Sequence, residues 1–166
     1  AIQGRTHIQS GAVDVLALPS LHGRVYFNRV SLPGDITTPP KWPPRFFHLR
    51  HGDVFNWWID TGRHKIMHID SADFINSELE GLTADIVCLC AIGRNWRPNY
   101  VKDIVRLLKP KMIIPCHWDW FFDAYGQSNR LLPGVDLAGF IQEIKDEQVE
   151  VGLLPIDGMC CFNDFS

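Results

Sequence analysis

Three side chains that can bind metal ions, His22, Asp70 and His117, each stand just after a short apolar segment typical of a β-strand. Strands hold side chains at fixed positions while the loops beyond them stay open to a substrate. Imidazole and carboxylate groups are donors that zinc binds in catalytic sites. Residue types and positions therefore suggest a metal site. Taken one at a time, however, each histidine is more typical of a cap or a surface position.

The elements that must position these residues are predicted from apolar periodicity. A short helix is expected to end at Glu80 with Ser71 or Asp73 as its N-cap, and Gly81 closes it. The remaining elements are strands at 12–18, 45–49, 54–59, 65–69, 84–91, 112–115 and 149–154, and helices at 98–108 and 136–146. An antiparallel meander is thus followed by alternating strands and helices, which predicts a layered α/β (α+β) protein.

Two connections have a clear local explanation. Residues 31–44 contain five prolines, which exclude a helix or a central strand and predict an ordered surface loop. The run Asp60-Thr61-Gly62 matches the short signature of aspartic proteases, but Arg63 follows it and the run falls between two predicted strands. A hairpin turn, with Gly62 supplying a positive φ, is the favoured interpretation.

Composition limits the classes of function. The chain has 166 residues, 46% of them hydrophobic, and a formal net charge of −3, which predicts one domain over 1–166. No basic stripe is present, which argues against nucleic acid as a partner, and no apolar run is long enough to span a bilayer. The five cysteines lack disulfide-type spacing, which favours reduced thiols and a cytoplasmic location. Cys88 and Cys90 are interpreted as small buried hydrophobes.

The order of the segments resembles the metallo-β-lactamase-fold hydrolases. The segments that carry the likeness are PSLHGR, the strand and Asp-Ser of MHIDSADF, ADIVCLCAIG and KPKMIIPCHWDWF. They are most similar to the branch that contains N-acylphosphatidylethanolamine phospholipase D-like and ascorbate-6-phosphate lactonase-like proteins. The likeness covers about residues 5–125. It implies that His22, Asp70 and His117 are metal ligands and that Asp70, the catalytic carboxylate, bridges two ions.

The same resemblance implies an αββα sandwich, of which this chain would be mainly the C-terminal β-α half. The family carries an upstream H-x-H-x-D-H motif that supplies further ligands, and no such motif occurs in this sequence. Ile69 stands where the family has Gly before the bridging Asp, and Ser71 stands where it has Thr. The expected enzyme is therefore a metal-dependent hydrolase that is incomplete in this chain alone. Its complete site would hold two zinc ions, with manganese or iron as alternatives.

The chemistry implied is attack by a metal-bound hydroxide on a phosphoester, lactone or related ester. Carboxyl and hydroxyl groups near the ligands could orient the imidazoles, and arginine and tryptophan side chains at strand ends could bind an anionic or apolar substrate group. The candidates for orientation are Ser71, Asp73 and Asp119, and those for substrate binding are Arg94, Arg97, Trp118 and Trp120. Surface, capping or core roles remain open for each of them.

Two other interpretations stay open. The chain could be a non-catalytic half-fold that serves as a partner subunit or scaffold. Alternatively, two histidines and one carboxylate could hold a single ion of the non-haem iron type. Possible partners are a small-molecule ester or phosphoester, the missing N-terminal half or a partner chain, and a second copy in a homo-oligomer. His7, His48 and His51 are predicted to be surface residues, and His64 and His68 to stand too far apart to chelate.

Overall fold

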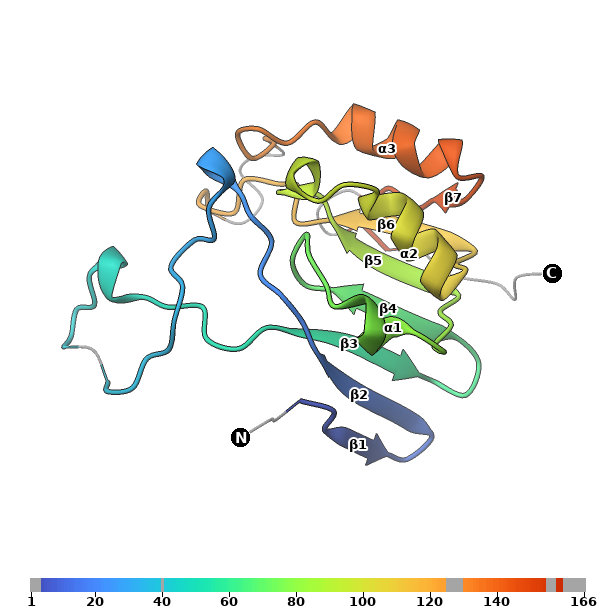
Figure 1. Ribbon diagram of the computed structural model, residues 1–166, viewed down its shortest axis with the longest axis horizontal. Helices are drawn as coiled ribbons and strands as arrows, with labels where there is room; N and C mark the ends of the chain where they lie inside the picture. Colours follow the sequence, from blue (N-terminus) through green and yellow to red (C-terminus); the bar gives the residue numbers. More distant parts are fainter. Residues whose placement is uncertain (1–3, 40, 125–129, 155–157, 160–166) are drawn as a thin grey trace.

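A mixed sheet of seven strands, ordered β1 to β7 as in the chain, forms the framework of this computed structural model, which describes residues 4–39, 41–124, 130–154 and 158–159 (Figure 1). The strands are β1 His7–Ser10, β2 Val13–Pro19, β3 Phe55–Asp60, β4 Lys65–Ile69, β5 Ile86–Cys90, β6 Met112–Cys116 and β7 Glu150–Val151. Neighbours pair antiparallel from β1 to β4 and parallel from β4 to β7. The predicted meander followed by strand–helix alternation is confirmed.

The three α-helices of the described residues lie on one face of this sheet (Figure 1). They are α1 Asn76–Leu79, α2 Tyr100–Leu108 and α3 Leu137–Asp146, and three short 3₁₀ turns are η1 Tyr26–Asn28, η2 Phe46–His48 and η3 Arg94–Trp96. Helix α3 begins where the sequence predicts, because the carboxylate of Asp136 accepts the Gly139 N–H at 2.9 Å. No helix among the described residues is long and apolar enough to cross a membrane.

The hydrophobic core lies between the helices and the sheet. Met67, Val87 and Ile113 project from β4, β5 and β6, and Ile104 and Phe140 pack in the same core from the helices, all with 0% exposure. Burial of each such side chain stabilises the fold by about 1.5–3 kcal/mol. This packing holds the strand ends, and the loops that follow them, in fixed relative positions.

The opposite face of the sheet is also apolar but only partly covered. The register places Trp57 beside His68, His68 beside Cys88 and Cys88 beside Ile114, so these side chains share the face opposite Met67. Each of them is only partly buried. A sheet with apolar residues on both faces is typical of a central layer that packs on both sides.

The connection between β2 and β3 differs from the prediction. Residues 20–39 and 41–54 form a long arm that extends away from the sheet (Figure 1), and the strand predicted at 45–49 is wrong. Its residues form the 3₁₀ turn η2, and Phe46 and Phe47 are 70% and 59% exposed. A strand needs a neighbour to pair with, and both edges of β2 are already paired, one with β1 and one with β3. The arm therefore cannot pair with the strand from which it departs.

The N-cap predicted for the first helix is also wrong. Helix α1 follows Ile75, and no side chain caps it. Ser71 Oγ accepts the Gly23 N–H at 2.8 Å, and the carboxylate of Asp73 contacts Arg97. The two side chains that could have capped the helix therefore bind residues from distant parts of the chain instead.

Candidate metal centre

The three predicted ligands gather at one edge of the sheet because β2, β4 and β6 run in the same direction. Two antiparallel pairings separate β2 from β4, and two parallel pairings separate β4 from β6. Asp70 and His117 directly follow β4 and β6, and His22 follows β2 by three residues. Residues far apart in the sequence thus lie along the same edge, where the carboxyl ends of the strands leave the sheet and where open α/β sheets bind ligands.

Electrostatic interactions link the members of this cluster. Burial lowers the pKa of His117 below its usual value, and the neighbouring His22 and His68 lower it further, while Asp70 and Asp119 raise it. A lowered pKa favours the neutral imidazole of His117, which is the form that binds metal. Within the described part of the chain, however, no three His, Cys, Asp or Glu side chains already stand close enough together to hold an ion.

A close backbone contact holds His22 beside the loop that carries Asp70. A Cβ atom on Gly23 would lie 2.8 Å from the Ala72 backbone nitrogen, so only glycine allows this approach. The Gly23 N–H donates to Ser71 Oγ at 2.8 Å, and Ser71 is 8% exposed. The glycine and the serine therefore fix the distance between two predicted ligands, although Ser71 acts on the backbone beside His22 and not on its ring.

His117 is held by a thiol that the sequence interpretation treats only as a small hydrophobe. Cys90 is fully buried, as predicted, and burial raises its pKa to about 12. Its thiol donates to the Ile92 carbonyl at 3.6 Å, and its sulfur lies 3.6 Å from His117 Nδ1. The sulfur lone pair can accept the Nδ1 proton, and this arrangement leaves Nε2 of His117 available to an ion.

Aromatic side chains flank His117 on the loop that follows β6. Trp118 and Trp120, the predicted substrate contacts, pack against the hydrophobic core and are partly buried. Phe121 and Phe122 are 55% and 66% exposed, and the Phe121 ring centroid lies 5.5 Å from that of His117. The exposed apolar surface next to the cluster therefore comes mainly from the two phenylalanines.

Arg97 and Asp73 pair with each other and join two of the loops. The Arg97 guanidinium contacts the Asp73 carboxylate, donates to the Phe74 carbonyl at 3.1 Å and to Asn76 Oδ1 at 2.6 Å, and lies 3.6 Å from the Phe74 ring centroid. The carboxylate predicted to orient an imidazole thus contacts a guanidinium. These contacts connect the loop after β5 to the loop after β4.

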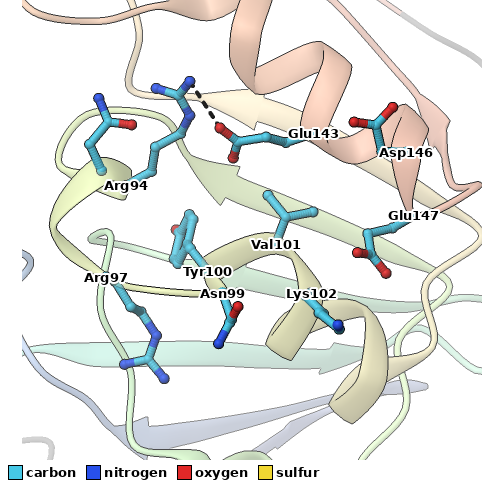
Figure 2. Close-up of a pocket in the computed structure, with 10 residues that line it drawn as sticks. Arg94, Arg97, Asn99, Tyr100, Val101, Lys102, Glu143, Asp146 and Glu147 are labelled. Atoms are coloured by element: carbon cyan, nitrogen blue, oxygen red, sulfur yellow. Dashed lines mark ion pairs between the residues drawn. The ribbon is translucent and has the colours of Figure 1, made fainter.

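Arg94 anchors helix α3 to the loop after β5. Its side chain is 4% exposed, and its Nη2 lies 3.3 Å from carboxylate oxygens of both Asp136 and Glu143. Figure 2 shows this arginine at a hollow of about 350 Å³ between the start of α2 and α3. None of the three predicted ligands lines the hollow, so this space is separate from the cluster at the strand ends.

One histidine of the cluster, His51, is not among the ligands predicted from the sequence. His51 is predicted to be a surface residue, but it is half-buried, and its ring centroid lies 4.6 Å from that of His22. The corresponding predictions for His7 and His48 are confirmed, since both are exposed. A signal was present in the sequence: His51, like His22, precedes a glycine at one end of the long arm.

Comparison with solved structures identifies the fold. The metallo-β-lactamase-fold protein YhfI from Bacillus subtilis matches with a TM-score of 0.54 and 13% identity, over 96% of this chain and 53% of YhfI. A mutant of CmlA β-hydroxylase matches with a TM-score of 0.53 and 16% identity, over 92% of this chain and 32% of CmlA. A second structure of CmlA, a diiron β-hydroxylase from Streptomyces venezuelae, matches with a TM-score of 0.49 and 15% identity over the same shares of the two chains.

The described chain therefore has the metallo-β-lactamase type of α/β fold, and the resemblance seen in the sequence is confirmed at the level of the fold. The chain spans about one third to one half of the length of these proteins. No protein-family profile and no curated protein sequence matches it.

Proposed function

We propose that this chain is part of a metal-dependent hydrolase that acts on a phosphoester, lactone or related ester. One observation supports the proposal above all others. Three strands that run in the same direction are followed by His22, Asp70 and His117. The close contact of Gly23 with Ala72 and the hydrogen bond from Gly23 to Ser71 hold the first two of these loops together.

The donor groups suit a divalent metal ion. A carbonyl oxygen can only accept, so the 2.8 Å contact between His22 Nδ1 and the Gly23 carbonyl places the proton on Nδ1 and leaves a lone pair on Nε2. The Cys90 sulfur, 3.6 Å from His117 Nδ1, can accept the corresponding proton of that ring and leave its Nε2 free. Two neutral imidazoles and a carboxylate are a donor set for zinc, and manganese or iron are alternatives. In this proposal zinc is the resident ion, two ions being present in the complete site.

A bound metal ion supplies a water of lowered pKa and stabilises negative charge that develops on the ester. His22 and His117 would hold metal, and Asp70 would contribute its charged carboxylate between them. The exposed rings of Phe121 and Phe122 offer an apolar wall for a substrate beside His117. Asp119, which acts electrostatically on His117, favours the positive charge of a metal at this position.

The remaining part of the site would come from outside the described residues, either from an N-terminal half or from a partner chain. Two observations support this part of the proposal. The solved structures that match are two to three times as long as this chain. The sheet face that carries Trp57 and Ile114 is apolar and only partly covered, as expected for a surface that a second layer covers.

The test measures metal and hydrolysis together, in the full-length gene product and in this chain alone. Zinc retained after gel filtration is measured by mass spectrometry, and activity is measured with bis(p-nitrophenyl) phosphate and with a lactone. We expect His117→Ala and Asp70→Asn to lose at least about tenfold in zinc affinity and in kcat/KM. His48→Ala, on an exposed histidine of the arm, is the control and should change neither quantity.

A His117→Ala protein that keeps the zinc affinity of the original would refute the ligand assignment. A folded full-length protein that binds no zinc, manganese or iron would favour the second candidate, a non-catalytic partner subunit or scaffold. The specific observation in favour of that candidate is that the described residues contain no group of three gathered metal-ligating side chains.

A further inference from the structure

The two ends of the long arm run side by side beyond the sheet. The β2–β3 ladder pairs Pro19 with Phe55, and the Ser20 N–H continues it by donating to the Val54 carbonyl at 2.9 Å. Extending this antiparallel register places His22 opposite Gly52, one residue from His51. The arm therefore returns to the sheet at the point where it left and brings a second histidine to the predicted metal ligand.

The two imidazoles have the same hydrogen-bonding arrangement. His22 Nδ1 lies 2.8 Å from the Gly23 carbonyl, and His51 Nδ1 lies 2.6 Å from the Gly52 carbonyl. Because a carbonyl only accepts, each ring in its neutral form carries its proton on Nδ1 and has a free lone pair on Nε2. Their centroids are 4.6 Å apart with an interplanar angle of 30°.

The Nε2 atom of His51 lacks a partner. It is shielded from solvent, and no described residue forms a hydrogen bond with it. A buried acceptor without a partner costs free energy, so such atoms in native proteins call for a proton donor or a cation. The neighbouring imidazole of His22 cannot satisfy it, because the only ring proton of His22 already binds the Gly23 carbonyl.

We propose that His51 is a further metal ligand, which binds a divalent transition-metal ion through Nε2 next to His22. The inference rests on the proposed function, since His22 is the ligand beside which His51 acts. With His51 the donors of this chain number four: His22, His51, Asp70 and His117. Three or four protein ligands are what zinc requires, and His22 and His51 would supply two of them side by side.

The direct test is nuclear magnetic resonance of the full chain labelled with ¹⁵N-histidine. Long-range ¹H–¹⁵N correlation spectra assign the protonated nitrogen of each ring, with His51→Gln and His22→Gln identifying the signals. Without metal, both rings should show protonated Nδ1 and unprotonated Nε2. Addition of zinc should shift Nε2 of His51 and of His22, and leave His48 unchanged.

Zinc affinity gives a second measurement, by competition with a chromophoric chelator. His51→Ala should weaken zinc binding by at least about tenfold, and His48→Ala should have no effect. Free imidazole should restore part of the affinity of His51→Ala by entering the space left by the ring. Urea unfolding shows whether His51→Ala is folded. If His51→Ala does not fold, the measurement uses His51→Gln, which keeps polar atoms at this position.

The outcomes separate this inference from the proposed function. If zinc shifts His22 and His117 but leaves His51 unchanged, and His51→Ala keeps its affinity, the inference is overturned while the proposed function stands. If zinc shifts none of the three histidines in this chain, the inference is overturned, and if it shifts none of them in the full-length protein either, the proposed function is overturned with it. If zinc shifts His51 with the others but the full-length protein hydrolyses no ester, the site is supported and the hydrolase is refuted.

Discussion

Replacing Gly23 by alanine tests how the candidate site is held together. The new Cβ would lie 2.8 Å from the backbone nitrogen of Ala72 and 3.0 Å from its carbonyl carbon. Both atoms belong to the main chain, so neither can rotate away as a side chain would. The two loops must separate, and this movement weakens the bond from the Gly23 N–H to Ser71 Oγ.

The expected loss of stability follows from these two contacts. Overpacking against a fixed backbone costs about 1–3 kcal/mol, and a buried hydrogen bond contributes about 1 kcal/mol net. We therefore expect Gly23→Ala to lower the free energy of unfolding by about 2–4 kcal/mol. The free energy of unfolding of a natural domain is about 5–15 kcal/mol, so the variant should still fold. Zinc affinity should fall as well, because His22 moves away from Asp70.

Urea denaturation followed by tryptophan fluorescence measures this change. Ser77→Ala, on an exposed residue of α1, is the control and should stay within about 0.5 kcal/mol of the original protein. Ser71→Ala removes only the acceptor of the hydrogen bond and should cost about 1–3 kcal/mol without the steric component. Gly23→Ala with the stability of Ser77→Ala would refute the close approach of the two loops.

Other changes test the contacts around the site. Arg97→Ala should lower the free energy of unfolding by about 2 kcal/mol, because it leaves the Asp73 carboxylate without its partly buried partner. The control Arg106→Ala, at an exposed ion pair, should lower it by less than about 1 kcal/mol. Equal losses of the two variants in urea unfolding would contradict this prediction. The Lys65 N–H and the Lys111 ammonium hold the pKa of Asp85 below its usual value. The ionised carboxylate therefore stabilises the fold above the unfolded pKa of 3.8, and this stabilisation is lost as the pH falls through the lower folded pKa. Unfolding at a series of pH values should show this loss in the original protein and not in Asp85→Asn, and parallel curves would rule it out. The Cys90 thiol, with a pKa of about 12, should resist iodoacetamide at pH 8 until the protein unfolds, and peptide mapping that finds it alkylated in the folded protein would show that it is accessible.

Much of the fold can be predicted from local pattern. The strand 65–69 has its predicted bounds, and the predicted strand 112–115 is extended by one residue. Their apolar runs are buried on at least one face and are bounded by polar or proline-containing segments, so periodicity alone locates them. Locating such a strand also locates the residue directly after it, which is why Asp70 and His117 can be predicted as site residues.

Contacts between distant segments cannot be predicted in this way. The sequence suggests Arg94 and Arg97 as anion-binding residues of one loop, and the structure gives each of them carboxylate partners from other elements. Asp73 is available as a cap to its own helix but contacts a guanidinium instead. Pairings of this kind depend on which loops meet in space, and no local spacing contains that information.

By itself, the sequence determined the order of strands and helices and the ligand-type residues at the strand ends, because apolar periodicity and turn residues act over a few positions. Only the tertiary structure decided which of those ends meet. The common direction of β2, β4 and β6 brings His22, Asp70 and His117 to one edge. The return of the arm then places His51 beside His22, and this neighbour exists only because two segments 29 residues apart continue one antiparallel ladder.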